Sequence, residues 1–176
     1  AMIAMALSCN PKLLIADEPT TALDVTIQAQ ILDLMRDLKG KIGSAVMIIT
    51  HDLGVIAEMA DNVVVLYAGQ VVEYADVKSI FNDPLHPYTI ELQESIPRLT
   101  DERGKKLYPI EGSIPDPLDL PSGCKFHPRC RFAAQMCSVE DPPLITLENR
   151  RQVRCWRYDP AHASVFEGTA KKERIH

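Results

Sequence analysis

The chain has 176 residues, of which 46% are hydrophobic and 24% are charged, and its formal net charge is −5. This ordinary globular composition excludes a wholly disordered chain. An acidic chain lacks the basic surface that bulk nucleic-acid binding requires, so no nucleic-acid partner is expected. No apolar run approaches the ~20 residues of a membrane-spanning helix, and the apolar first residues lack the basic flank of a signal peptide.

Charge, proline and cysteine are unevenly distributed along the chain. Residues 1–97 carry 13 acidic and 5 basic side chains, whereas residues 98–176 carry 11 acidic and 14 basic ones. Eleven of the 13 prolines follow residue 80, and four of the five cysteines lie late in the sequence. We therefore expect two regions with different physical properties, with a boundary between about residues 80 and 110.

The pattern of apolar residues up to residue 74 predicts alternating helices and strands. The predicted elements are a helix at 1–8, a strand at 13–16, a helix at about 25–38, a strand at 45–50, a short helix at 53–59 and strands at 62–67 and 70–74. The early strands are continuous apolar runs, which are typical of strands buried on both faces of a parallel sheet. This order predicts an α/β fold with helices on the faces of one sheet.

The ends of these elements carry local signals. Asp24 is a suitable N-cap for the helix at about 25–38, and Gly40 lies just past its predicted end. Ala68 and Gly69 form the tight turn of a hairpin. Single helical turns are expected at 77–81 and 88–95, followed by a proline-rich loop at 97–121. The predicted apolar face of the long helix consists of Ile27, Ile31, Leu34, Met35 and Leu38.

Two carboxylates follow the first predicted strand, in the sequence LLIADEPT. Ligands of open α/β sheets bind at the carboxyl ends of the strands, so this position suits chemistry. Asp17 can hold Mg²⁺, directly or through water, and Glu18 can orient or deprotonate a water molecule. On these residues alone, a solvated Asp-Glu pair that caps a turn is the alternative.

The longer string LLIADEPTTALD, with His51 following in the context IITHD, resembles the ATP-binding-cassette (ABC) ATPases. LLIADEP is similar to their Walker B motif, TALD (Thr21 to Asp24) to their D-loop, and His51 to their switch histidine. The resemblance implies that Asp17 organises Mg²⁺ on ATP, that Glu18 is the catalytic carboxylate that polarises the attacking water, and that His51 reaches the γ-phosphate. It also implies that Asp24 lies at the interface of two ATPase domains that sandwich ATP.

Three elements of that family precede its Walker B strand: the phosphate-binding loop, the glutamine loop and the LSGGQ-like signature. The sequence contains no G-x-x-x-x-G-K-[ST]. The chain therefore resembles only the C-terminal part of an ABC ATPase domain, which is a P-loop NTPase, and we expect a fragment of a longer protein. We expect this piece alone to bind ATP weakly and not to hydrolyse it.

The later sequence resembles the C-terminal extension of one ABC branch, the ATPase subunits of oligopeptide and dipeptide importers, which includes some nickel importers. The resemblance rests on HPYT (86–89), IPRL (96–99) and EGSIPDPLDLPSGCKFHPRC (111–130). It implies an ATPase that energises peptide import and is peripheral on the cytoplasmic face of the cell membrane. The implied partners are a second ATPase subunit, identical or paralogous, membrane-spanning permease subunits and, indirectly, a substrate-binding protein. Dipeptide, oligopeptide and nickel importers are not separated, because other subunits select the substrate.

Four cysteines lie within and after this extension motif at wider spacings than C-x2-C. They therefore match neither a typical zinc finger nor the common ferredoxin patterns. Four thiolates can nevertheless close a site for an iron–sulfur cluster or for Zn²⁺. Members of the importer branch carry a [4Fe–4S] cluster in this extension, so the resemblance implies one here, with Zn²⁺ as the alternative. Reduced structural thiols packed around Phe126, Phe132 and Trp156 are a third interpretation. The predicted ligands are Cys124, Cys130, Cys137 and Cys155.

Other residues near these motifs receive secondary interpretations. His127 is a possible metal ligand that four cysteines leave unneeded, and His86 is expected to be structural. Cys9 is expected to be a small buried hydrophobic residue. Four arginines are expected to favour thiolates and to offset the charge of an anionic site. They are Arg129, Arg131, Arg154 and Arg157.

We divide the chain into the C-terminal half of an ABC ATPase domain (1–80), a loop-rich, cysteine-containing extension (81–160) and a polar tail (161–176). Residues 168–176 are expected to be disordered. Two functions compete. One is the ATP-hydrolysing subunit of a peptide importer, and the other is a metal-binding regulatory or interaction module on a catalytically incomplete ATPase remnant.

Overall fold

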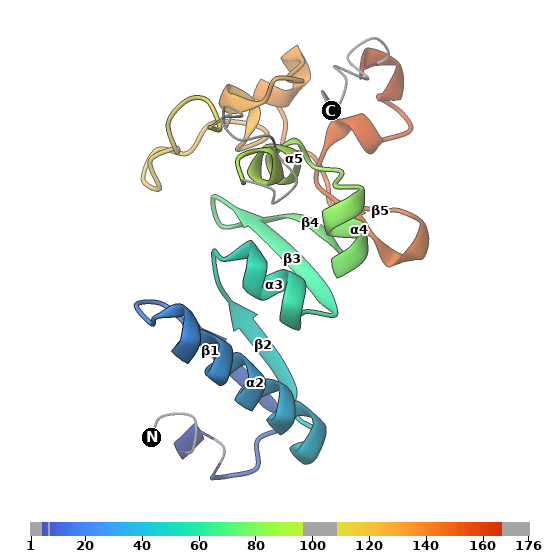
Figure 1. The fold of residues 1–176 in the computed structure, drawn as a ribbon. Helices are drawn as coiled ribbons and strands as arrows, with labels where there is room; N and C mark the ends of the chain where they lie inside the picture. The colour runs from blue at the N-terminus through green and yellow to red at the C-terminus, as the bar shows by residue number, and fades with distance from the viewer. Residues whose placement is uncertain (1–4, 7, 97–108, 167–176) are drawn as a thin grey trace. The chain divides into compact units, whose positions relative to one another are not determined.

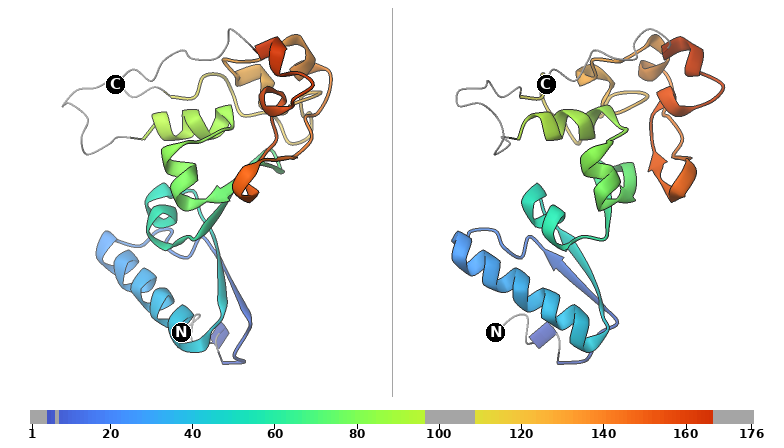
Figure 2. Two further views of the ribbon diagram at one scale, coloured as in Figure 1. Left: turned by 90° about the vertical axis from the view of Figure 1, so that its right-hand side faces the viewer. Right: turned by 45° about the vertical axis from the view of Figure 1, so that its right-hand side comes forward.

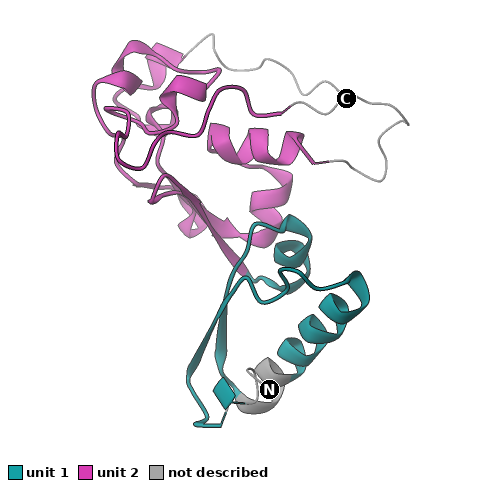
Figure 3. Ribbon diagram, turned by 90° about the vertical axis from the view of Figure 1, so that its left-hand side faces the viewer, with its two compact units in different colours: residues 1–61 teal, residues 62–176 magenta. Residues whose placement is uncertain are grey.

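The structure is a computed structural model that describes residues 5–6, 8–96 and 109–166 (Figure 1; further views in Figure 2). The predicted disorder at 168–176 lies outside the described residues, as do parts of the helix predicted at 1–8 and of the loop predicted at 97–121. The chain forms two compact units, residues 1–61 and 62–176 (Figure 3).

The first unit is built on two parallel strands, β1 (Leu13–Asp17) and β2 (Ala45–Ile49). Helix α2 (Val25–Ile42) connects them, and helix α3 (Leu53–Met59) follows β2. Both views of Figure 2 show α2 running alongside the two strands. The element order of this unit is therefore the predicted one, and it places the end of β1 beside the end of β2.

The predicted end of the long helix is wrong. Helix α2 continues through Gly40 to Ile42, and Gly43 follows it with a φ of 68°. Because this left-handed conformation closes a helix end and suits glycine, the stop signal belongs to Gly43 and not to Gly40.

The predicted buried face of α2 is also partly wrong. Among the helix side chains that the structure describes, Leu32 and Met35 are the buried apolar ones, whereas Ile27 and Leu34 are exposed. The side chain of Leu38, also predicted on the apolar face, lies outside those described. The buried stripe is therefore rotated by about one position from the predicted one, which a 3.6-residue period allows without changing the helix itself.

The first two strands are not buried on both faces within the described residues. Leu13, Ile15, Met47 and Ile49 are each between 44 and 59% exposed. The strand register pairs Ile15 with Met47, so these side chains share one face of the sheet. Helix α2 lies alongside this pair of strands in every view (Figures 1 and 2). The exposure of these four apolar side chains shows that no described residue covers their face of the sheet.

The second unit contains a separate antiparallel sheet with the strand order β3-β4-β6-β5. Its strands are β3 (Asn62–Tyr67), β4 (Gln70–Asp76), β5 (Ile145–Thr146) and β6 (Gln152–Val153). The described residues thus form two sheets where the sequence predicts one. The hairpin at Ala68 and Gly69 is confirmed, and both residues have positive φ, as tight hairpin turns require.

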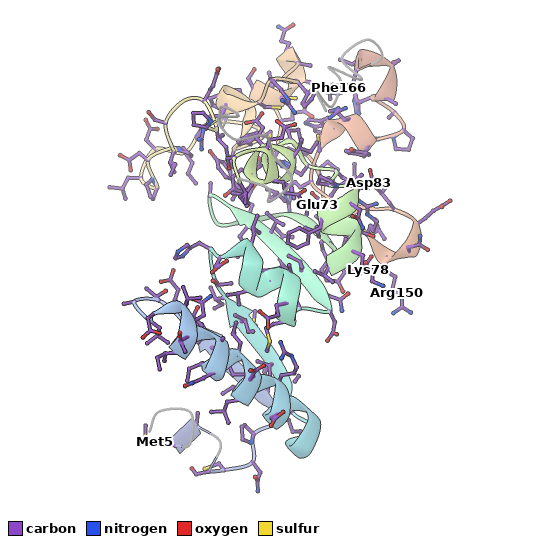
Figure 4. The ribbon with its side chains drawn as sticks, in the orientation of Figure 1. Met5, Glu73, Lys78, Asp83, Arg150 and Phe166 are labelled. Atoms are coloured by element: carbon purple, nitrogen blue, oxygen red, sulfur yellow. The ribbon has the colours of Figure 1, made fainter. Side chains whose placement is uncertain are left out.

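Two helices follow this hairpin close to their predicted positions, α4 (Val77–Asn82) and α5 (Pro87–Glu94). The other described residues of the unit are mainly loop, with short 3₁₀ helices at His127–Arg129, Gln135–Ser138, Glu148–Arg150, Trp156–Tyr158 and Ala163–Phe166. Phe166, labelled in Figure 4, packs in a buried cluster with Cys137 and Trp156. The packed core therefore includes a residue that the predicted division assigns to the tail.

A buried carboxylate joins β4 to the loop between α4 and α5. Glu73, labelled in Figure 4, is fully buried, and its two oxygens accept the backbone N–H groups of Leu85 at 2.8 Å and His86 at 2.9 Å. The Arg151 guanidinium lies 3.8 Å from Glu73 and 2.9 Å from the Asp83 carboxylate. Burial raises the pKa of Glu73, while the backbone N–H bonds and Arg151 act in the opposite direction.

His86 has a structural role, as predicted. Its Nδ1 accepts the Tyr88 N–H at 3.1 Å, so the side chain caps the start of α5. Burial lowers the pKa of His86 to about 3, so the imidazole is neutral near pH 7. With Nδ1 acting as the acceptor, Nε2 carries the proton of the neutral ring.

Candidate functional site

The first site lies where β1 and β2 end. Glu18 follows β1 directly, and its N–H donates to the Ile49 carbonyl at the end of β2 (2.8 Å). His51 stands two residues after β2, and its Nδ1 lies 3.2 Å from Glu18 Oε1. Two side chains that are 33 positions apart in the sequence therefore meet because the strands are parallel neighbours.

The Glu18 carboxylate is held on both of its oxygens. Oε1 faces His51, and Oε2 accepts the Thr21 hydroxyl at 3.0 Å. These two contacts lower the pKa of Glu18, with Thr21 as the larger cause and His51 as the second. Because an ionised carboxylate only accepts, the Nδ1 of His51 must be the donor in their contact.

The remaining predicted residues lie beside this pair. Asp17 ends β1 opposite Ile49, and it is exposed. Asp24 is the N-cap of α2, and its carboxylate accepts the N–H groups of Thr26 and Ile27, each at 3.0 Å. The structure therefore gives Asp24 a local capping role, and its role at a subunit interface stays a prediction.

A hydrogen bond that sequence reasoning missed connects α2 to the segment after His51. The Gln28 amide donates to the Asp52 carboxylate at 3.3 Å, and Asp52 in turn caps α3 through the Gly54 N–H at 2.8 Å. Gln28 lies one helical turn after Asp24 and belongs to no recognisable sequence motif. Its contact with Asp52 depends on how the chain folds, so the sequence does not reveal it.

The second site is in the other unit, where all four predicted cysteines line one pocket. The pocket wall also contains aromatic side chains, Phe126, Phe132 and Trp156, and two histidines, His86 and His127. The Cys124 N–H donates to the Cys137 carbonyl at 2.8 Å, which joins two of the cysteine-bearing segments directly. Three segments separated in sequence are thus brought to one place.

Burial acts against the thiolate form of three of the four thiols in this pocket. Burial raises the pKa of Cys124, and it raises the pKa of Cys130 and of Cys155 to about 12. Within the described ranges, no group of three or more Cys, His, Asp or Glu side chains is arranged so that it could hold a metal ion. The four cysteines predicted as metal ligands therefore lie around one pocket, but their side chains are not arranged to bind one metal ion. A metal at this place stays a prediction.

Three of the four arginines near the cysteines act differently from the prediction. Arg129 donates to the Ile110 and Glu111 carbonyls, Arg131 binds both oxygens of Glu94, and Arg154 donates to the Val71 and Pro142 carbonyls. Arg157 stacks over the Phe132 ring at 4.3 Å and lowers the pKa of Cys155, but the effect of burial is larger. These arginines mainly tie the loops together.

Two smaller expectations are also resolved. Cys9 is exposed, so its predicted burial is wrong. The Nδ1 of His127 lies 2.9 Å from the Cys124 carbonyl, which can only accept, so Nδ1 carries a proton and its partner nitrogen is left for other contacts.

Comparison with known proteins relates the chain to one group of proteins. Residues 72–137 match the family described as "Oligopeptide/dipeptide transporter, C-terminal region". The chain is 58% identical over 158 residues to the oligopeptide transport ATP-binding protein AppD of Bacillus subtilis, a match that covers 90% of this chain and 48% of AppD. It is 53% identical to OppD of Haemophilus influenzae and 49% identical to the dipeptide transport protein DppD of Escherichia coli, each over 88% of this chain and 47% of the relative.

The chain is thus similar to the ATP-binding proteins of oligopeptide and dipeptide transport, and residues 72–137 match the family model of their C-terminal region. The predicted resemblance to this branch is confirmed. The chain spans about half the length of these curated relatives. A solved structure, cbiO1 from Clostridium perfringens, is 34% identical over 46% of this chain and 32% of that chain with a TM-score of 0.43, an overlap too small to define the fold. None of the helices in the described segments has the length and apolar character needed to cross a bilayer.

Gly123 controls how closely two cysteine-bearing segments approach. Its φ is 62°, and a Cβ built there would lie 2.4 Å from the Cys137 carbonyl oxygen. We expect Gly123→Ala to destabilise the chain by about 1–3 kcal/mol more than Gly69→Ala, because Gly69 also has a positive φ but has nothing within 4 Å of such a Cβ. Urea unfolding of both variants measures the difference in their free energies of unfolding. Equal losses of stability would show that the close approach of the Cys137 carbonyl to Gly123 does not contribute to the effect.

Proposed function

We propose that this chain is the C-terminal part of an ATPase subunit that energises peptide import. The observation that carries the proposal is the contact between Glu18 and His51 at the ends of two parallel strands. The relatives' names, which refer to ATP binding and to oligopeptide or dipeptide transport, support the same assignment. The competing hypothesis, a metal-binding module on an inactive remnant, gives no reason for the Glu18 carboxylate to be held on both oxygens.

In the proposed reaction, Glu18 accepts a hydrogen bond from the attacking water and thereby orients it. The water oxygen bonds to the γ-phosphorus, the bond from that phosphorus to the β–γ bridging oxygen breaks, and ADP and inorganic phosphate leave with the proton released. Phosphoryl transfer of this kind depends mainly on positioning and on charge stabilisation. A lowered pKa keeps Glu18 ionised and able to accept.

His51 would meet the γ-phosphate through its second ring nitrogen. Nδ1 is engaged with Glu18, and the side chain is 79% exposed, so Nε2 is accessible to a ligand. Because Nδ1 already carries a proton, Nε2 can donate to a phosphate oxygen only in the doubly protonated ring. The imidazolium form is therefore the one that would stabilise negative charge in the transition state.

Asp17 fits the proposed role at Mg²⁺. It presents an exposed carboxylate at the end of β1, and Mg²⁺ takes oxygen ligands while keeping several waters, so one protein carboxylate together with phosphate oxygens is enough. When bound, Mg²⁺ neutralises charge on the phosphates. Asp17 would orient the nucleotide, leaving the water to its neighbour Glu18.

The proposed assembly is the one that the resemblance to ABC importer ATPases implies. Two ATPase subunits would close on ATP with the segment around Asp24 at their interface, and they would drive membrane-spanning permease subunits that receive substrate from a binding protein. The chain would lie at the cytoplasmic face of the cell membrane. Asp24 already fixes the start of α2 through two backbone bonds, so its segment is rigid enough to serve as a contact.

The catalytic assignment is tested by Glu18→Gln in the full-length subunit that contains this chain. The amide cannot act as an anionic acceptor for the water, so we expect ATP turnover to fall at least ~100-fold while ATP still binds. The matched control is Glu58→Gln, which changes an exposed carboxylate paired with Arg36. Turnover within about twofold of the unmodified protein would refute the role of Glu18 and favour the inactive remnant.

For the second site we propose a [4Fe–4S] cluster held by Cys124, Cys130, Cys137 and Cys155. The support is that all four cysteines line one pocket and that backbone N–H groups bond to three of the thiols, among them the Phe132 N–H to Cys130 Sγ at 3.4 Å. The amides of Phe126, Phe132 and Arg157, each two residues after a cysteine, lower the pKa of that cysteine. Such N–H bonds favour thiolate ligands and tune clusters. A single Zn²⁺ needs ligands within ~2.3 Å of one point, and the described residues form no such group.

Metal analysis of the anaerobically purified chain tests this second proposal. We expect about four irons and four acid-labile sulfides per chain, lost in Cys130→Ser and retained in Cys9→Ser, since Cys9 is exposed in the other unit. The iron content should decrease as the pH falls. The buried thiols of Cys130 and Cys155 have a raised pKa and must release their protons to bind metal. One zinc without sulfide, or no metal, would contradict a cluster.

A further inference from the structure

The backbone at Glu18 adopts a conformation that is unfavourable for a glutamate. Its φ is 45°, in the left-handed region, and it is one of few non-glycine residues with positive φ in the described part of the chain. Such strain persists only where surrounding contacts impose it, and it often re-aims a functional side chain. The Glu18 N–H is held by the Ile49 carbonyl at 2.8 Å, which anchors one side of the residue.

Thr21 anchors the other side, and it does so twice. Its N–H donates to the Glu18 carbonyl at 3.2 Å, closing a four-residue turn, and its hydroxyl donates to Glu18 Oε2 at 3.0 Å. One residue therefore holds both the backbone and the carboxylate of Glu18. His51 occupies the opposite oxygen, Oε1.

We propose that the Thr21 hydroxyl is a positioning residue for ATP hydrolysis, which sets the orientation of the Glu18 carboxylate. This inference rests on the proposed function, because it assigns Thr21 a role only through Glu18. A glutamate side chain has three rotatable bonds, and exposed glutamates sample many rotamers. A single contact with His51 restrains one oxygen, whereas contacts on both oxygens define the plane of the carboxylate and the direction of its free lone pairs.

The contact between Thr21 and Glu18 allows nucleotide binding and ATP hydrolysis to be tested separately. The hydroxyl of Thr21 is committed to Glu18, so its removal should leave nucleotide binding intact while the water is misaligned. A displacement of a reacting group by a fraction of an ångström to 1 Å can lower a rate by up to ~100-fold. The expected signature is a fall in kcat with little change in KM for ATP.

The test compares Thr21→Val and Thr21→Ser in the full-length subunit. Valine keeps the shape of threonine and removes the hydroxyl, so we expect kcat to fall about tenfold or more with KM within about twofold. Serine keeps the hydroxyl and should restore most of the rate. The matched control is Thr146→Val, an exposed threonine of the other unit whose hydroxyl accepts the Gln152 amide at 3.3 Å, and it should leave the rate unchanged.

A double variant separates this inference from the proposed function. If Thr21 acts through Glu18, Thr21→Val should cause no further loss in a Glu18→Gln background. Full activity of Glu18→Gln alone would overturn the proposed function. An inactive Glu18→Gln together with an unaltered kcat in Thr21→Val, or a serine variant as slow as the valine one, would overturn only the positioning role of the Thr21 hydroxyl.

Discussion

The carboxylate of Glu73 is the interaction on which the second unit depends. It is fully buried on β4, in the middle of the antiparallel sheet, and both of its oxygens accept backbone N–H groups from the loop before α5. A buried charge is tolerated only when it is paired and hydrogen-bonded. Arg151, which lies just before β6, supplies the positive charge and also binds Asp83.

This one group therefore fixes three segments that are distant in sequence. It holds the turn that starts α5, and through Arg151 it holds the approach to β6, where Glu73 pairs with Val153. His86, whose N–H Glu73 accepts, also lines the pocket of the cysteines. Cys155 follows β6 by two residues, so the same anchor decides where one of the four thiols lies. The cysteine pocket is thus a consequence of the sheet and its buried carboxylate.

Much of the first site could be predicted from the sequence. Asp17, Glu18 and His51 follow apolar runs, and parallel strands bring such positions together at one edge. The hydroxyl contact of Thr21 and the link between Gln28 and Asp52 could not be predicted, because they depend on the turn at Glu18 and on how α2 lies against the strand ends. Residue type and spacing do not encode them.

The fold after Ala75 was harder to predict from the sequence than the fold before it. The two-residue strands β5 and β6 are too short to show a period of two, and they exist because β4 offers a free edge. Earlier in the chain, the sequence prediction placed the helix stop at Gly40, whereas the left-handed φ that closes the helix is at Gly43. The arginines near the cysteines were predicted to be charge partners of thiolates, whereas Arg129, Arg131 and Arg154 bind backbone carbonyls and Glu94.

The most direct test of this account is the stability of Glu73→Gln, measured by urea unfolding and by amide hydrogen exchange at Leu85 and His86. Glutamine offers one acceptor oxygen where two N–H groups need one each, and it leaves Arg151 without its buried partner. We expect the free energy of unfolding to fall by roughly 3 kcal/mol. We also expect the Leu85 and His86 amides to lose their protection against hydrogen exchange. The exposed pair of Glu94 and Arg131 provides the control, since Glu94→Gln should cost under ~1 kcal/mol. Unchanged stability and protection in Glu73→Gln would contradict the account.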